Sequence, residues 1–475
     1  MGKNSESAAD DRDESVDAPS RREALRSRGR SLRSDCPRSS HGNVVLGQAS
    51  RDPLGLLEQS NAGRVEHLLP VRYSRMLESP FAFFRGTAVL QAYDLKGTPS
   101  AGVIVQCCGD CHVMNFGGFA SPERSLVFDI TDFDETFPAP FEWDVKRLAV
   151  SFVLAARWLG FDDPSAWHIV ECVVGAYRAF MGQFAQMKAL EVWYAQITEE
   201  DVVRHFADDP KALRYLRQRV EKAMKSTSEV VFHKLTHVVN GRPRIVDQQP
   251  LLYHVDPSVV DLERDAVPFF EGYRKNLPPA HQNLLDRFEL VDLAFKVVGV
   301  GSVGTHCFVT LWMADNDDPL FLQVKEARPS VLEGLAGPAS WQNNGERVVT
   351  GQRLMQSASD IFLGWSESRQ GEYAYVRQLR DHKVAQELTG MSRGLLASTG
   401  ELCGRALARA HAKSGRAAAI DGYLGSGTNF DTAIAAYALA YVDQVEEDYA
   451  EFQAAVNAGR FPVESMPSGL EAAIR

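Results

Sequence analysis

Three polar residues in and after the segment CCGDCHVMNFGG (107–118) are of the types that phosphoryl transfer requires. Asp110 and Asn115 lie five positions apart, and Asp132 follows in LVFDITDFDET. The reaction needs a carboxylate that orients the acceptor hydroxyl and oxygen ligands for Mg²⁺, a hard cation that prefers carboxylate and amide oxygens. These residues supply the three functions. The acidic run 129–135 follows apolar residues, which favours a strand end directed into a cleft over a solvated turn.

The same segment also permits a metal or thiol site. Cys108 and Cys111 form a C-x-x-C pair beside His112, and zinc prefers such ligands. A structural zinc site usually has a second ligand pair, whereas the cysteines elsewhere stand alone, at positions 36, 172, 307 and 403. The plainer interpretation is that Cys107 and Cys111 are small buried side chains around the loop.

A second pattern, GVGSVG, contains Gly299, Gly301 and Gly304. In a dinucleotide-binding fold such glycines open a helix, but here the strand pattern THCFVTLW follows them. A glycine-rich hairpin between two strands is typical of the loop that covers the phosphates in protein-kinase-like folds, because backbone N–H groups approach phosphates where side chains are missing. A plain hairpin turn is the alternative.

Lys325, in FLQVKEA, is a charge in an otherwise apolar strand. Such a lysine costs stability unless it meets an anion. In a kinase-like site the anion is the α/β-phosphate, and a glutamate on a helix holds the lysine in place. Glu346 is the first candidate for that glutamate and Glu333 the second. The alternative is an edge strand that exposes Lys325 to solvent.

Hydrophobic periodicity predicts the elements that must position these residues. Helices are expected at 144–160, 167–194, 345–355, 401–413 and 430–452, with a mostly helical region at 198–290 broken by a turn at NGRPR (240–244). Strands of an antiparallel meander are expected at 295–300, 305–312 and 320–327, with a further strand at 373–379. A β-rich patch therefore interrupts a helical chain, which indicates two lobes.

Composition narrows the functional class. The 475 residues are 45% hydrophobic and 24% charged, as in a globular protein long enough for two domains. A net charge of -11 argues against nucleic-acid and anionic-membrane partners. The most apolar run, 148–160, is too short to span a membrane and contains Arg157. The N-terminus lacks the apolar core of a secretory signal, so we expect a cytoplasmic protein with free thiols.

These observations predict four regions. Residues 1–48 are expected to form a disordered tail, because they are rich in Ser, Arg, Asp and Glu. Residues 49–290 would form a helical large lobe with the catalytic and metal loops. Residues 291–380 would form a β-rich nucleotide-binding lobe, and residues 381–475 a helical segment that completes the large lobe.

The motif G-D-x-H-x-x-N followed by D-F-D resembles the catalytic and metal-binding segments of aminoglycoside phosphotransferases and related small-molecule kinases. The resemblance implies that Asp110 is the catalytic base, that Asn115 and Asp132 bind magnesium, and that His112 braces the loop. It also implies that Asp144, in FEWDVKRLA, caps the catalytic loop from the next helix.

Two departures from that pattern matter. Cys108 replaces the first histidine of the motif, which puts one contact of the loop in doubt. The catalytic loop also precedes the glycine loop and the lysine, whereas these kinases have the opposite order. We therefore expect an α+β, protein-kinase-like two-lobed fold that is circularly permuted, in which CGRALARAHAKSG (403–415) supplies the helix that leads into the catalytic loop.

Over nearly its whole folded length the chain also resembles a bacterial family known only as domain of unknown function 2252. The resemblance is carried by stretches such as SPFAFFRG (79–86), GDCHVMNFGGFASPER (109–124), KVVGVGSVGT (296–305) and ARAHAKSG (408–415). It implies that these segments form one unit but does not reveal a reaction.

Together the patterns predict an Mg-ATP-dependent phosphotransferase that acts on a hydroxyl of a small molecule or protein, with ATP and Mg as cofactors. Two alternatives stay open: a nucleotide-binding regulatory or scaffold protein without turnover, and transfer of AMP instead of phosphate.

Overall fold

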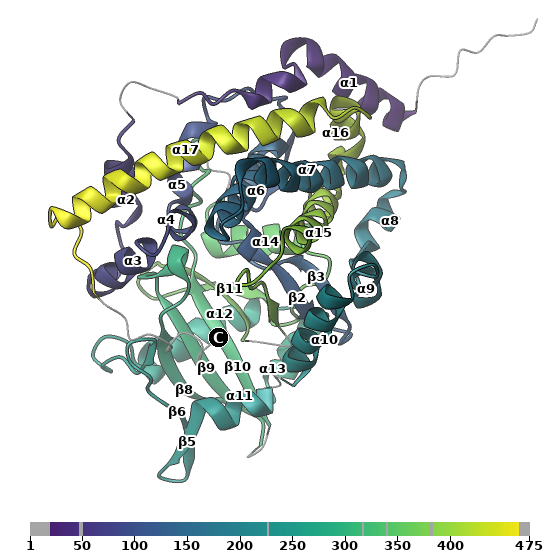
Figure 1. Ribbon diagram of the computed structural model, residues 1–475. Helices are drawn as coiled ribbons and strands as arrows, with labels where there is room; N and C mark the ends of the chain where they lie inside the picture. The colour runs from purple at the N-terminus through teal and green to yellow at the C-terminus, as the bar shows by residue number, and fades with distance from the viewer. Residues whose placement is uncertain are drawn as a thin grey trace, which may run out of the picture.

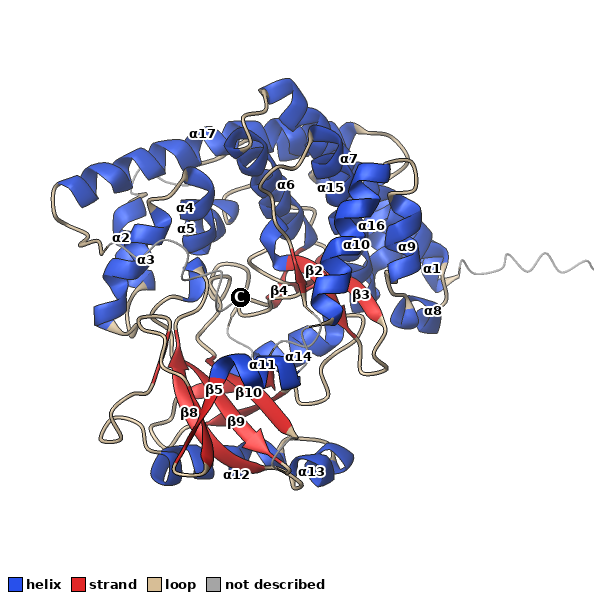
Figure 2. Cartoon of the chain, turned by 60° about the horizontal axis from the view of Figure 1, so that its bottom comes forward, coloured by secondary structure: helices blue, strands red, loops and turns tan. Residues whose placement is uncertain are grey.

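The helices of the chain lie mostly on one side of the molecule, and a six-stranded antiparallel sheet lies on the other (Figure 1, Figure 2). The chain is therefore of the mixed α+β class, as expected. The arrangement is that of a computed structural model, which describes residues 20–46, 51–225, 228–315, 318–338, 341–379 and 383–464.

The helical side is built around α6 (Phe141–Trp158), which is buried along almost its entire length. Helices pack on it from several directions, among them α7 (Asp163–Gln186) and α17 (Asn429–Asn457). Because α6 is enclosed on all sides, its charged residues Asp144 and Arg147 must find partners inside the protein.

A further helix, α15 (Arg393–His411), runs tightly against α7. A Cβ atom on Gly404 would lie 2.3 Å from the carbonyl oxygen of Val173, so only glycine permits this approach. The packing brings the end of α15 next to β1 (Ile104–Cys107), where the candidate site begins.

The sheet has the strand order β11-β12-β10-β9-β8-β7, and every neighbouring pair is antiparallel. Its strand β10 (Pro319–Glu326) is buried on both faces, because hydrophobic clusters cover the sheet on each side. Lys325 is consequently enclosed, and the solvent-exposed alternative is wrong. The other strands of the sheet are β7 (Leu252–Tyr253), β8 (Glu289–Lys296), β9 (Cys307–Met313), β11 (Gly364–Glu367) and β12 (Tyr373–Gln378).

Smaller sheets and further helices complete the described chain. The short strands are β2 (Phe116–Ala120), β3 (Leu126–Ile130), β4 (Phe137–Pro140), β5 (Thr236–Val239), β6 (Arg242–Ile245) and β13 (Val384–Ala385). The other helices are α1 (Arg21–Asp35), α2 (Pro53–Ser60), α3 (Leu69–Met76), α4 (Pro80–Gly86), α5 (Ala88–Leu95), α8 (Ala189–Tyr194), α9 (Glu199–His205), α10 (Pro210–Met224), α11 (Ser228–Leu235), α12 (Val267–Lys275), α13 (Pro279–Leu285), α14 (Asn344–Met355) and α16 (Ala417–Leu424).

The predicted disordered tail is wrong for the part of it that contains α1. This helix packs against α16 so closely that a Cβ atom on Gly29 would lie 2.0 Å from the carbonyl oxygen of Ala419. Arg33 donates to the carbonyl of Tyr423 at 2.8 Å. Composition alone suggested a solvated tail. The close contact at Gly29 and the hydrogen bond of Arg33 instead hold α1 on α16. Residues 1–19 and 47–48 of the predicted tail lie outside the described residues.

The predicted boundary at residue 291 also falls too late. The region 228–290 contains α11, the β5–β6 hairpin, β7, α12 and α13, and its apolar residues join the clusters on the two faces of the sheet. Of the predicted NGRPR turn, Asn240 and Gly241 form the tip of the hairpin, with φ of 51° and 79°, and Arg242–Arg244 belong to β6. Apart from β7, which is an edge strand of the sheet, these segments pack on the sheet and do not extend the helical side.

The predicted strands 305–312 and 320–327 are confirmed as β9 and β10 of an antiparallel meander. The strand predicted at 295–300 is wrong in its bounds, because β8 ends at Lys296 and residues 297–300 belong to the loop that follows it. All seven cysteines are free, as expected. Among the described residues, none of the helices combines the length and apolar character that crossing a bilayer requires.

Candidate active site

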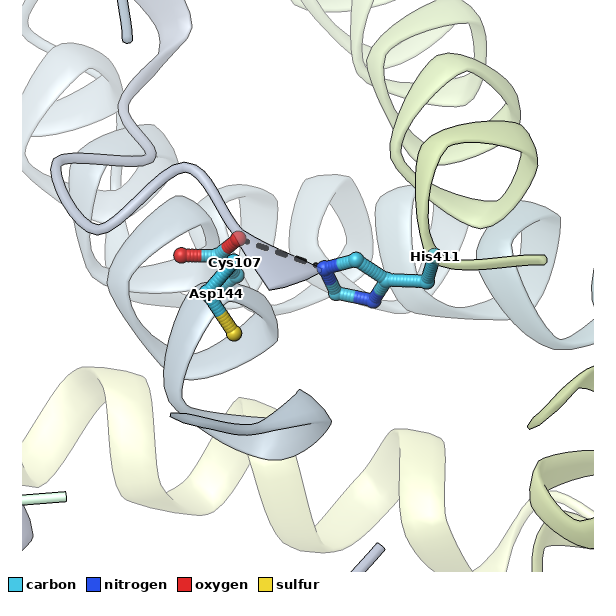
Figure 3. A group of neighbouring side chains, drawn as sticks. All are labelled: Cys107, Asp144 and His411. Atoms are coloured by element: carbon cyan, nitrogen blue, oxygen red, sulfur yellow. Dashed lines mark hydrogen bonds and ion pairs between the residues drawn. The ribbon is translucent and has the colours of Figure 1, made fainter. Parts of the chain in front are cut away.

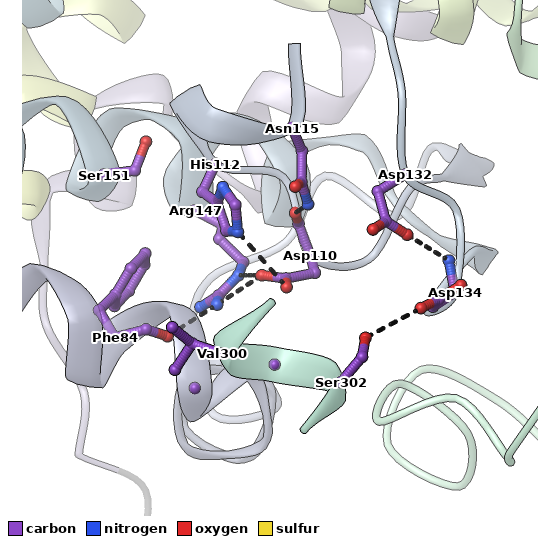
Figure 4. Close-up of polar contacts among 12 residues, drawn as sticks. Phe84, Asp110, His112, Asn115, Asp132, Asp134, Arg147, Ser151, Val300 and Ser302 are labelled. Carbon is purple, nitrogen blue, oxygen red and sulfur yellow. Dashed lines mark hydrogen bonds and ion pairs between the residues drawn. The ribbon is translucent and has the colours of Figure 1, made fainter. Parts of the chain in front are cut away.

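The loop after β1 and the β2–β3 hairpin bring the predicted metal ligands together. The carbonyl oxygen of Asn115 accepts a hydrogen bond from Thr131 N at 2.8 Å, so Asn115 lies beside the residue that precedes Asp132. The Asn115 side chain donates through Nδ2 to the carbonyl of Asp110 at 2.8 Å. Asp110, Asn115 and Asp132 therefore line the same end of the hairpin (Figure 4).

Asp110 forms an ion pair with Arg147, which reaches it from α6. Arg147 donates to Asp110 Oδ1 through Nε at 2.7 Å and approaches it through Nη2 at 2.6 Å. Burial raises the pKa of Asp110, but the positive charge of Arg147 and that of the nearby Arg85 outweigh it and hold the pKa below its ordinary value. The carboxylate is thus ionised at neutral pH, and 19% of the side chain is exposed.

His112 lies next to Asp110 as a neutral ring. Burial lowers the pKa of His112 to about 3, and its Nε2 is 3.7 Å from Asp110 Oδ2, which is too long for a hydrogen bond. The loop is held instead by hydrogen bonds of its main chain: the carbonyl of His112 accepts from Asn115 N at 2.8 Å, and Val113 N donates to the Ser151 side chain at Oγ, at 3.0 Å.

Asp144 caps the start of the same loop. Its carboxylate accepts from Cys108 N at 2.7 Å and from Gly109 N at 3.0 Å. His411, from the end of α15, lies 3.2 Å from the same carboxylate, and Ser414 Oγ accepts from Gln106 N at 3.0 Å. Segments from three distant parts of the chain therefore meet at this loop (Figure 3).

The zinc alternative does not fit these surroundings. The donor atoms of Cys107, Asp144 and His411 lie within 4.8 Å of one another, as do those of Cys108, Cys111 and Asp144. Among the described residues, however, each group offers three donors, whereas a structural zinc site has four. In the metal-free protein, burial raises the pKa of Cys107 and Cys108 well above the ordinary value and that of Cys111 to about 11. The shared carboxylate already accepts two main-chain N–H groups. The thiols are better described as buried packing groups.

Lys325 meets the acidic segment directly. Its Nζ lies 2.5 Å from Asp134 Oδ2 and 3.9 Å from Asp132 Oδ2, and only 4% of its side chain is exposed. Burial lowers the pKa of Lys325, but the two carboxylates together raise it well above its ordinary value. For Asp132 the two effects are reversed in sign. Burial raises the pKa of Asp132, but the positive charges of Lys325 and Arg377 outweigh burial and hold the pKa below its ordinary value. Lys325 and Asp132 are therefore both charged at neutral pH.

The predicted partner of Lys325 is wrong. Within the described residues neither Glu346 nor Glu333 forms an ion pair with it; the acidic partner is Asp134, whose other oxygen accepts from Tyr375 OH at 2.5 Å. In α14 the neighbouring Arg347 takes the inward position, because one residue along a helix turns the side chain by about 100°. Arg347 is buried and donates to the main-chain carbonyl of Asp134 at 2.9 Å.

The glycine-rich loop, 299–304, lies against the acidic segment. Ser302 Oγ donates to Asp134 Oδ2 at 3.3 Å, as Figure 4 shows. Gly299 is exposed and Gly301 is half-buried, whereas Gly304 is buried with a φ of 83°, in the left-handed region that favours glycine. The structure therefore brings the loop, Lys325 and the predicted metal ligands to one place.

Three residues of the site were not assigned roles from the sequence: Arg147, Asp134 and His411. A signal for Arg147 was present in WDVKRLA, where three charges interrupt a helix that is otherwise apolar. Asp134 was visible only as part of an acidic run. Nothing local singled out His411, because its role depends on the packing of α15 beside the loop.

The buried carboxyl group of Glu135, next to Asp134, should make the free energy of unfolding depend on pH. Its Oε2 accepts from Val331 N at 2.7 Å. Burial raises the pKa of Glu135 from 4.5 to about 7, against the opposing effects of that hydrogen bond and of Arg347. Because the folded state holds this proton more tightly, the stabilisation is complete below pH 4.5 and is lost as the pH rises through about 7.

Glu135→Gln, which cannot ionise, should therefore be more stable than the wild type at pH 8, by about 3 kcal/mol. The difference should shrink toward zero at pH 4. Urea unfolding followed by circular dichroism at both pH values measures it. A difference that does not change with pH would contradict the raised pKa.

In comparisons with known proteins, residues 64–455 match the family described as "Uncharacterized protein conserved in bacteria (DUF2252)". No curated protein and no solved structure matches the chain. The matched range contains the loop 107–115, the glycine-rich loop 299–304, Lys325 and Asp144, and it covers well over half of the sequence. The chain therefore belongs to the bacterial DUF2252 family.

Proposed function

We propose that this protein is an Mg-ATP-dependent phosphotransferase with a circularly permuted, kinase-like fold, acting on a hydroxyl of a small molecule or protein. One observation carries the proposal: Lys325 contacts Asp134, 191 residues earlier in the chain, and Asp132 lies 3.9 Å away. A buried lysine next to two carboxylates and a glycine-rich loop is the arrangement that binds nucleotide phosphates together with a metal.

The contacts of α15 support the permutation. In the usual kinase order the glycine loop and lysine come first, then a helix leads into the catalytic loop. Here His411, the last residue of α15, contacts Asp144. Ser414, just after the helix, accepts a hydrogen bond from Gln106, next to the loop that contains Asp110. Residues 289–415 followed by residues 104–134 would then run in the usual order.

The donor set suits magnesium. Asn115 uses its Nδ2 in a hydrogen bond, which leaves its side-chain oxygen for a cation, and Asp132 is ionised with 33% of its side chain exposed. An amide oxygen and a carboxylate are hard ligands of the kind that Mg²⁺ prefers. In this proposal Asn115 and Asp132 hold the ion, which when bound neutralises charge on the phosphates.

Asp110 is suited to orient the acceptor. Arg147 takes Oδ1, so Oδ2 is the oxygen that can accept the acceptor hydroxyl. Its lowered pKa makes it a weak base. That is sufficient where the transition state is loose and the attacking oxygen needs positioning more than early deprotonation. Lys325 would bind a phosphate in place of one of its carboxylate partners.

Thermal unfolding with and without Mg-ATP tests the proposal. At 100 times its dissociation constant, Mg-ATP should stabilise the wild type by about 2.7 kcal/mol. Lys325→Ala and Asp132→Ala should lose this shift. Glu346→Gln, the matched control, should keep it, because Glu346 does not contact Lys325. Absence of any shift in the wild type at millimolar Mg-ATP would refute the proposal.

The nature of the transferred group is a separate question. ATP labelled at the γ-phosphate and ATP labelled at the α-phosphate distinguish the two reactions in the same assay. Phosphoryl transfer puts only the γ label on the acceptor, whereas AMP transfer puts only the α label there. A protein that binds nucleotide without turnover would transfer neither.

A further inference from the structure

The main-chain carbonyls of the glycine-rich loop face the segment that contains α3. Three of them each accept a hydrogen bond from one arginine of that segment: Val298 from Arg75 at 2.5 Å, Val300 from Arg72 at 2.9 Å and Val303 from Arg64 at 2.6 Å. The carbonyl of Gly301 accepts from two of the same arginines, at 2.9 and 3.0 Å. That of Gly304 accepts from Val65 N at 2.8 Å. We call Arg64, Arg72 and Arg75 the arginine clamp.

Each of the three valines directly precedes a glycine. In a planar trans peptide the C=O of one residue and the N–H of the next point in opposite directions. The N–H groups of Gly299, Gly301 and Gly304 therefore point away from the clamp. None of the three donates a hydrogen bond within the part of the chain that the structure describes. Of the three residues, Gly299 is exposed and Gly301 is half-buried, whereas Gly304 is buried.

The clamp also places positive charge behind the loop. Arg72 and Arg75 are buried, with exposures of 1% and 4%. The hydrogen bonds of Arg64 and Arg72 go to main-chain carbonyls and, among the described residues, to no carboxylate. Burial lowers the pKa of Arg64 to about 10 and that of Arg72 well below its ordinary value, with a further contribution from repulsion between neighbouring arginines. An anion in front of the loop would relieve this repulsion.

We propose that the arginine clamp holds the glycine-rich loop from behind, so that the N–H groups of Gly299 and Gly301 are oriented toward nucleotide phosphates before the nucleotide arrives. Glycine-rich loops are otherwise costly to order, because glycine loses the most conformational freedom. A loop that is already ordered binds its ligand more tightly. The inference rests on the proposed function, since its ligand is the nucleotide of that function. The three arginines are positioning residues and do not touch the phosphates.

The test compares binding of Mg-ATP with binding of adenosine, which has no phosphate. Calorimetry or displacement of a fluorescent nucleotide measures both affinities in the wild type, Arg72→Lys and Arg75→Lys. Lysine keeps the charge but not the fork of donors. We expect each variant to lose about tenfold or more in ATP affinity, which corresponds to about 1.4 kcal/mol, while adenosine affinity changes less than about twofold.

Arg178→Lys is the matched control. Arg178 is a partly buried arginine on α7 that pairs with Asp431 at 2.8 Å, away from the glycine-rich loop. It tests whether loss of any structural arginine weakens binding. The ratio of ATP to adenosine affinity should be unchanged in this variant.

The outcomes separate the two proposals. If the wild type binds ATP and the clamp variants keep the wild-type ratio of affinities, the clamp is refuted and the proposed function stands. If the wild type does not bind ATP, both are refuted. A second measurement needs no variant: hydrogen exchange of the wild-type peptide spanning residues 298–305 should slow when Mg-ATP binds. Unchanged exchange at saturation would overturn the role of these N–H groups.

Discussion

Asp110→Asn should lower the rate of phosphoryl transfer by about 10²–10⁴-fold while Mg-ATP still binds. Asparagine keeps the size of the side chain but loses the negative charge with which Oδ2 would hold the acceptor hydroxyl. It also ends the ion pair with Arg147, so the folded fraction of the variant must be checked first. The rate is measured by single-turnover transfer of γ-labelled phosphate and the binding by calorimetry.

Asp443→Asn is a suitable control for this variant. Asp443 is an exposed aspartate that pairs with Arg157 on the helical side. It should leave both binding and transfer unchanged. Equal transfer by Asp110→Asn and the wild type would show that Asp110 has no part in the reaction. Mg-ATP binding without transfer in either protein would favour the nucleotide-binding protein without turnover.

The largest loss of stability is expected at Arg409, on α15. Its Nη2 donates to both carboxylate oxygens of Asp129, at 2.7 and 2.8 Å, and the exposures of the two side chains are 1% and 0%. Arg409→Met would leave the carboxylate of Asp129 buried without its cation. Breaking a buried pair from one side costs about 3–5 kcal/mol, so the variant should lose that much free energy of unfolding in urea.

A double-mutant cycle separates this cause from simple loss of packing. Asp129→Leu combined with Arg409→Met removes both charges, so the double variant should be more stable than the sum of the two single changes predicts. Additive losses would mean that the two charges are not coupled. Because Asp129 also accepts from Ser357 N at 2.7 Å, some loss from that hydrogen bond should remain in the double variant.

Much of the secondary structure could be predicted from the sequence. The predicted bounds agree to within a residue or two with β9, β10 and α14 for the segments 305–312, 320–327 and 345–355. The reason is that the apolar periodicity of each segment distinguishes strand from helix, and turn residues mark where it ends. The tail was misjudged because α1 is held by Gly29 and by hydrogen bonds to carbonyls, which composition does not reveal.

The sequence predicted which residues form the candidate site, but it did not predict which of them form ion pairs with one another. Asp110, Asn115, Asp132 and Lys325 could be named because carboxylates, amides and lysines at these spacings suit one chemistry. The counter-ion of Lys325 could not be named, because Glu346 and Asp134 both carry a carboxyl group. Which of them lies near Lys325 depends on how α14 and the segment after β3 pack against the sheet.

By itself the sequence determined much of the secondary structure and which side chains are able to bind a cation or a phosphate. Those properties depend on neighbours along the chain. Only the tertiary structure decided that Arg147 pairs with Asp110, that Asp134 pairs with Lys325, and that arginines of the segment 64–75 donate to carbonyls of the glycine-rich loop. The physical reason is that ion pairs and hydrogen bonds act over a few ångströms, so packing of distant segments selects among partners that the sequence leaves equivalent.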